Sequence, residues 1–150
     1  MYFMANKTEL TKLLNKEVAN FGVLYTKLHN FHWYVKGKLF FQLHQKFEEL
    51  YDETTGHFDE IAERILMLDE QPVATLKDFL ELATIEEAKG TETTEEMIDS
   101  LLSDFEQLNN ELGEGIEISE GLSDDVTADL LTGIRASLQK HIWMLKSTLK

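Results

Sequence analysis

Apolar residues recur at intervals of three and four along most of the chain, which is the spacing of a helix with one buried face. The first such stretch follows a cap at Asn6 or Thr8 and ends before Gly37. The second runs from about residue 40 to residue 68. We therefore expect two long helices joined by a short loop, with these apolar positions inside: Leu10, Leu13, Leu14, Val18, Phe21, Leu24, Tyr25 and Leu28, then Leu43, Phe47, Leu50, Tyr51, Phe58, Ile61, Ile65 and Leu68.

The pattern breaks after Asp69, where the only proline of the chain, Pro72, follows. Thr75 to Asp78 is typical of a cap for a short helix that ends near Ala83. A connection of about twenty-five residues is long enough to let the helices on either side of it run in the same direction. We expect this crossover to hold a short helix with an apolar face made of Leu76, Phe79 and Leu80.

The last part of the chain predicts two more long helices. Thr93 with Glu96 forms a capping box that opens a helix ending near Gly121, and Ser123 or Asp124 caps a helix that continues to the C-terminal residues. The fold class that follows is all-α: a four-helix bundle with a short extra helix in the crossover between the second and third long helices.

Composition narrows the class of protein. The 150 residues fit one domain (1–150), and eight glycines with one proline are too few for the many turns of a β-barrel. A net charge of −14 opposes binding to DNA and favours cations. The chain has no cysteine and no apolar run long enough for a membrane span or a secretory signal, so we expect a cytoplasmic protein.

Candidate metal ligands gather between residues 29 and 64. His44 with Glu48, and Asp59 with Glu63, are each four residues apart and so share a helix face. His32 lies near the end of the preceding helix. Imidazole together with carboxylate suits iron, manganese or zinc, and the absence of cysteine excludes thiolate ligands.

The spacing of these residues argues against a site within one chain. His44 and Asp59 are fifteen residues apart, which is about 22 Å along one continuous helix. The Glu-x-x-His pairs of a single-chain di-iron bundle are absent from the sequence. If a two-fold axis sets two such helices antiparallel, the histidine end of one meets the carboxylate end of the other. The geometry therefore favours two identical sites per dimer.

Other polar residues in the same region have simpler interpretations. A histidine on a helix is more often a packing or surface residue than a ligand, and we interpret His29, His57 and His141 in this way. The four acids from Glu48 to Glu53 are typical of a solvated helix face.

Taken together, these motifs resemble the Dps family of mini-ferritins. The resemblance rests on HW at positions 32 and 33, HQKFE from position 44 and DEIAER from position 59. DDVTADLL from position 124 and KHIWMLK from position 140 are similar to the last helix of the family. The resemblance covers essentially the whole chain.

The resemblance implies a ferritin-like fold and a shell of twelve subunits with ferroxidase centres at two-fold interfaces. His32 and His44 would be ligands from one chain, and Asp59 and Glu63 ligands from its neighbour. Glu48 matches a further acid of the family, which reaches the second iron through water.

The implied function is storage and detoxification of iron. The protein would oxidise Fe²⁺ with hydrogen peroxide, keep ferric mineral in the shell and protect the cell against oxidative stress, while Zn²⁺ or Mn²⁺ could occupy the same ligands. Acids around the start of the last helix would line three-fold pores that draw cations inward. These acids are Glu120, Asp124, Asp125 and Asp129.

Two alternatives remain open. A nucleoid-protecting protein would bind DNA, but the family members that do so carry lysine-rich termini, and only Lys7, Lys12 and Lys16 fall in the first sixteen residues here. We therefore expect no DNA binding. A purely structural helical oligomer would leave the histidine and acid pairs without metal.

Overall fold

The computed structural model describes residues 5–150 and consists, over that range, of helices and connecting loops. Residues 1–4, the beginning of the expected 1–150 domain, lie outside the described residues. The helices are α1 (Lys7–Tyr34), α2 (Phe40–Met67), α3 (Leu76–Leu82), α4 (Thr94–Gly121) and α5 (Asp125–Thr148). The predicted all-α fold with a short helix in the crossover is confirmed.

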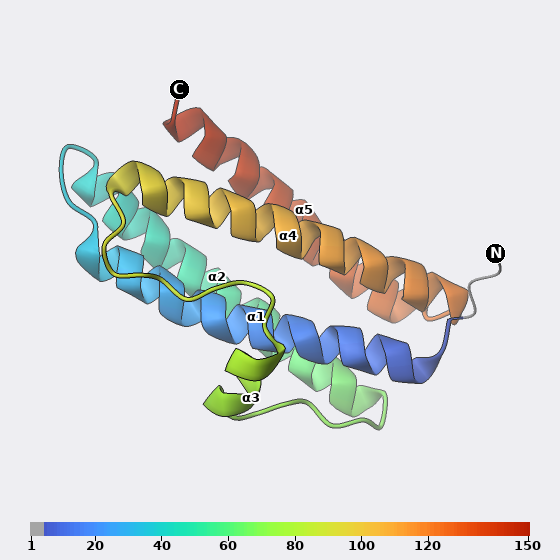
Figure 1. Cartoon of the computed structure of the whole chain (residues 1–150). Coiled ribbons are helices and arrows are strands. Elements are labelled where there is room, and N and C mark those ends of the chain that lie inside the picture. Colours follow the sequence, from blue (N-terminus) through green and yellow to red (C-terminus); the bar gives the residue numbers. More distant parts are fainter. Residues whose placement is uncertain (1–4) are drawn as a thin grey trace.

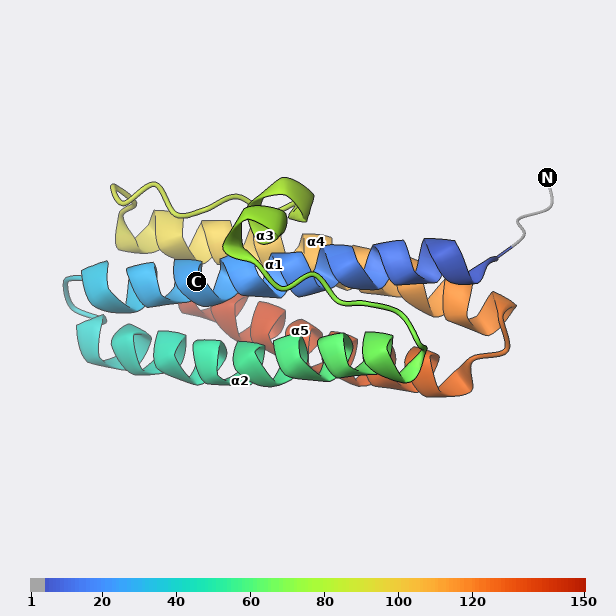
Figure 2. The same ribbon diagram turned by 90° about the horizontal axis from the view of Figure 1, so that it is seen from below.

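Four long helices form the bundle, and α3 lies on its outside against α1 (Figures 1 and 2). Short loops make α1 and α2 antiparallel neighbours, and likewise α4 and α5. The crossover runs back along the bundle, so that α2 and α4 point the same way (Figure 1). This is the arrangement that the length of the crossover predicted.

Local signals set the helix ends. The side chain of Asn6 accepts a hydrogen bond from the main-chain N–H of Glu9, and Thr75 caps α3 in the same way. Thr93 and Glu96 form the predicted capping box at the start of α4. Of the two residues considered as the cap of α5, the structure selects Asp124.

The buried faces of the helices share one hydrophobic core. Two glycines permit close contacts around it. A Cβ on Gly115 would lie 2.6 Å from Cδ2 of Leu13, where α4 approaches α1. A Cβ on Gly22 would lie 2.8 Å from the ring of Phe79, which docks α3 on α1. None of the helices within residues 5–150 is long and apolar enough to cross a membrane.

Candidate metal centre

His32 and His44 meet where the chain turns from α1 into α2. His32 lies in the last turn of α1, and His44 lies near the start of α2. The loop between them contains Gly37, whose φ of 101° is a conformation that other residues rarely adopt. The two imidazole rings stack with centroids 3.7 Å apart and planes 12° from parallel. The fold thus pairs two histidines that belong to different helices.

Reciprocal hydrogen bonds fix both rings. Nδ1 of His32 donates to the main-chain carbonyl of His44 at 2.6 Å, and Nδ1 of His44 donates to the carbonyl of His32 at 2.7 Å. Because a carbonyl oxygen can only accept, each Nδ1 carries the hydrogen, and Nε2 of a neutral ring keeps its lone pair. Histidine ligands in metal sites are commonly oriented by such a bond from the other ring nitrogen. Both residues therefore fit a metal such as iron.

An aromatic group surrounds the histidine pair. The ring of Tyr51 packs edge-on against His32 and stacks on His29 at 3.7 Å. Its hydroxyl donates to Oε1 of Glu48 at 3.2 Å. Partial burial and the nearby Glu48 carboxylate raise the pKa of Tyr51. Tyr51 therefore links Glu48 to His32 at the end of α1, a contact that the sequence, which placed Tyr51 on the apolar side of its helix, did not reveal.

The carboxylates of Asp59 and Glu63 form the other half of the candidate centre. Both are exposed on the same face of α2, one turn apart. The charge of Asp59, together with a hydrogen bond between the two carboxyl groups, raises the pKa of Glu63. Two like charges held side by side repel each other, and a bound cation relieves that repulsion.

The two halves do not meet within one chain. Helix α2 is continuous from Phe40 to Met67, so His44 and Asp59 remain about 22 Å apart. Across residues 5–150, no three histidine or acidic side chains converge in a way that would hold a metal ion. A complete site of these residues requires a second chain.

The predicted pore acids lie around the turn between α4 and α5. Glu120, Asp125 and Asp129 are exposed. Asp124 differs, because its carboxylate accepts hydrogen bonds from the N–H and hydroxyl of Thr127 and pairs with Arg64. Burial acts against ionisation of Asp124, but the bonds from Thr127 and the charge of Arg64 outweigh it and lower the pKa of Asp124. Its carboxylate is therefore already engaged within the chain.

Glu53 corrects one interpretation of the sequence. It was expected on a solvated acidic face with Glu48, but its carboxylate accepts hydrogen bonds from Nε2 of His57 at 3.1 Å and Nε2 of His141 at 3.0 Å. Burial opposes ionisation of Glu53, but these two bonds prevail and lower the pKa of Glu53 well below its ordinary value. His141 thus joins α5 to α2, and His57 makes a bond within α2. Both agree with the structural role expected of them.

Comparison with known proteins gives consistent results. The family model for the Ferritin-like domain matches residues 11–150. The DNA protection during starvation protein 2 of Bacillus anthracis is 52 % identical over 141 residues, covering 94 % of this chain and 97 % of that protein. General stress protein 20U of Bacillus subtilis (strain 168) is 49 % identical, with the same coverage of both chains.

Solved structures agree with the relatives found by sequence. The crystal structure of Dps from Staphylococcus aureus superposes with a TM-score of 0.95 at 47 % identity, and the match covers 97 % of this chain and 98 % of that one. Similarity over nearly the full length of both chains, in sequence and in fold, places this chain in the Dps family of ferritin-like proteins.

Proposed function

We propose that this protein is a ferroxidase that oxidises Fe²⁺ at sites shared by two subunits and stores the ferric product inside a homododecameric shell in the cytoplasm. His32 and His44 of one subunit bind iron together with Asp59 and Glu63 of its neighbour, and Glu48 supplies a further acid. The observation that carries the proposal is the reciprocal Nδ1–carbonyl pairing of the histidines, which frees both Nε2 atoms for metal.

The exposed side chains of α2 support a two-fold contact. Phe41, near the histidine end, is 81 % exposed, and Met67, at the carboxylate end, is 68 % exposed. In an antiparallel pair of α2 helices, the Phe41 end of one helix lies beside the Met67 end of the other. Gly56, near the middle of α2, has no atom within 4 Å of its Cβ position in the same chain, so a second helix can approach it closely. An antiparallel pair of α2 helices would cover both ends.

The residues have distinct chemical tasks in the proposed site. Neutral imidazoles supply nitrogen donors without charge, while Asp59 and Glu63 supply negative charge, which stabilises Fe³⁺ more than Fe²⁺ and so favours oxidation. We propose hydrogen peroxide as the oxidant. Two Fe²⁺ each give one electron to one peroxide molecule, its O–O bond breaks, and hydrolysis with two waters yields two FeOOH and four protons. The same ligands suit Zn²⁺ or Mn²⁺, which would compete with iron.

Peroxide titration tests this proposal directly. Iron-free shells are loaded anaerobically with Fe²⁺, and peroxide is added in steps while ferric absorbance is recorded. We expect oxidation to end at one peroxide per two Fe²⁺, faster than in buffer without protein, with the product remaining soluble in the shell fraction. An oxidation rate equal to that of free Fe²⁺ would rule out a ferroxidase.

The names of several relatives refer to DNA protection, and we infer that this chain protects DNA by removing Fe²⁺ and peroxide and not by binding it. The net charge of −14 repels a polyanion. A gel shift at low salt should show no retarded DNA. Retardation that disappears as salt is raised would instead support the nucleoid-binding alternative.

A further inference from the structure

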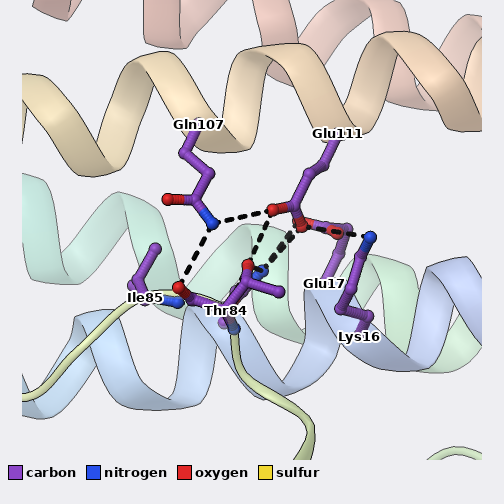
Figure 3. Close-up of polar contacts among 7 residues, drawn as sticks. Lys16, Glu17, Thr84, Ile85, Gln107 and Glu111 are labelled. Carbon is purple, nitrogen blue, oxygen red and sulfur yellow. Dashed lines mark hydrogen bonds and ion pairs between the residues drawn. The ribbon is translucent and has the colours of Figure 1, made fainter.

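A buried polar cluster lies between α1, α4 and the end of the crossover (Figure 3). It includes two acids on facing helices, Glu17 on α1 and Glu111 on α4. Glu17 is fully buried, at 0 % exposure, and Glu111 is 7 % exposed. Buried carboxyl groups are costly unless they are neutral or well paired, so the partners of each oxygen decide their state.

The two carboxyl groups have unequal partners. Oε1 of Glu17 accepts from the amide of Asn20 at 3.2 Å, whereas its buried Oε2 accepts no hydrogen bond within residues 5–150. Glu111 receives the hydroxyl of Thr84 at 2.6 Å and the amide of Gln107 at 3.0 Å. The Asn20 amide also donates to Oε1 of Glu111 at 3.1 Å, so the two carboxyl groups lie side by side, and a proton on one of them lets them hydrogen bond to each other.

The proton belongs on Glu17. Burial, the hydrogen bond to Glu111 and the charge of Glu111 all raise the pKa of Glu17. Burial opposes ionisation of Glu111, but hydrogen bonds from Glu17 and Thr84 outweigh it and lower the pKa of Glu111. The charged groups facing Glu17 are Glu111 and the Lys16 ammonium, which also lies 3.4 Å from Oε1 of Glu111. The crossover presents uncharged Thr84 to the pair.

The same cluster anchors the crossover. The main-chain N–H groups of Thr84 and Ile85 donate to Oδ1 of Asn20 at 2.7 and 3.3 Å. The carbonyl of Thr84 accepts from Gln107 at 3.2 Å. The N–H, the hydroxyl and the carbonyl of Thr84 thus all bond to groups arranged around the two acids. Ionising Glu17 would place two buried carboxylates in contact beneath this anchor.

We propose that one proton held between Glu17 and Glu111 acts as a pH-dependent latch that fastens the Thr84–Ile85 end of the crossover to the bundle. Loss of the proton releases that segment. The latch is closed at acidic pH and opens as the pH rises, because the opened state exposes Glu17 to water, where it ionises at an ordinary carboxyl pKa.

The sign and size of the effect follow from proton linkage. Opening releases one proton between the ordinary carboxyl pKa of about 4.3 and the raised pKa of Glu17, so the opening constant rises by up to about tenfold per pH unit in that window. Above the raised pKa, the closed state is also ionised and the opening constant becomes flat. The stability that the proton contributes is therefore complete at low pH and lost as pH rises.

Hydrogen exchange tests the latch on the assembled, iron-free protein. Exchange of the Thr84 and Ile85 amides is compared at each pH between wild type and Glu17→Gln, which keeps the shape and an N–H donor toward Glu111 but cannot ionise. The opening constant of wild type divided by that of Glu17→Gln should rise by up to about tenfold per pH unit and then level off. A matched change at an exposed acid of α4, Glu114→Gln, should behave like wild type. A ratio independent of pH would overturn the latch.

An infrared measurement on wild type needs no variant. Labelling with ¹³C-glutamate should identify a protonated glutamic acid band that persists above the ordinary carboxyl pKa and disappears at higher pH, in parallel with the loss of amide protection. The absence of any such band above the ordinary carboxyl range would overturn the proposal even if Glu17→Gln failed to fold.

Discussion

Arg64 and Asp124 form an ion pair in which Nη2 of Arg64 lies 3.1 Å from Oδ1 of Asp124, and this pair ties the carboxylate end of α2 to the start of α5. Asp124 is at the same time the cap of α5. One side chain therefore stabilises both the end of a helix and the contact between two helices.

Asp124→Ala should destabilise the protein by about 1–2 kcal/mol, because it removes the cap and leaves Arg64 without its partner. Calorimetry should show a lower midpoint of unfolding, whereas the exposed Asp129→Ala should change it little. The pKa of Asp124 is lowered in the folded state. The stability that its carboxylate contributes is therefore complete above the ordinary aspartate pKa and is lost as the pH falls through the lowered pKa of the folded protein. Equal midpoints for the two variants at neutral pH would contradict this role.

His44→Ala should slow peroxide-dependent oxidation of Fe²⁺ by more than about tenfold, because it removes a nitrogen ligand and the imidazole ring that stacks on His32. The shell should still assemble, as judged by sedimentation. His29→Phe keeps a ring against Tyr51 and lacks both nitrogens, so it is the control and should oxidise iron normally. If His44→Ala is as active as wild type, the histidine pair is not the metal site.

Mixed shells test whether the site is shared between chains. His44→Ala and Asp59→Asn subunits, each inactive alone, are dissociated, mixed equally and reassembled. A mixed dimer has one doubly damaged site and one intact site, so random mixing restores about one quarter of all sites. No recovery in shells shown by mass spectrometry to be mixed would mean that each site is built within one chain. Helix α2 would then have to break between the two halves.

The pore is tested by changing its exposed acids together. Glu120→Gln, Asp125→Asn and Asp129→Asn should slow the initial uptake of Fe²⁺ at low ionic strength, where the Debye length is about 30 Å, and have little effect at 1 M salt, where it is about 3 Å. Asp124 is left unchanged because its loss would affect stability. A control with equal charge change, Glu86→Gln, Glu95→Gln and Asp99→Asn, should retain wild-type rates at both salt concentrations. If both triple variants show the same uptake rates at each salt concentration, the predicted pore acids do not guide the entry of iron.

The helices and their caps could be predicted because their signals are local. The polar side chain of Asn6, Thr75 or Thr93 and the donor it satisfies are three residues apart in sequence. Asp59 and Glu63 could be assigned to one helix face for the same reason, because they are only four residues apart.

Contacts between helices could not be predicted in this way. Glu53 looked like part of a solvated face because its partner His141 is 88 residues distant. Asn20 gave no signal of its bond to the crossover amide of Thr84, 64 residues later. The sequence identified His32 and His44 as candidate ligands, but the exchange of hydrogen bonds between them depends on how the Gly37 loop folds.

The unbroken course of α2 makes it a spacer as well as a scaffold. In the proposed dimer, the two sites lie at opposite ends of the same pair of helices, about 22 Å apart, which exceeds the Debye length of about 8 Å under physiological conditions. Charge arriving at one site is thus screened from the other. One residue inserted between His44 and Asp59 would rotate the carboxylates by about 100° about the helix axis and turn them away from the histidines of the partner. The segment between the two half-sites can therefore accept substitutions but not a change in length.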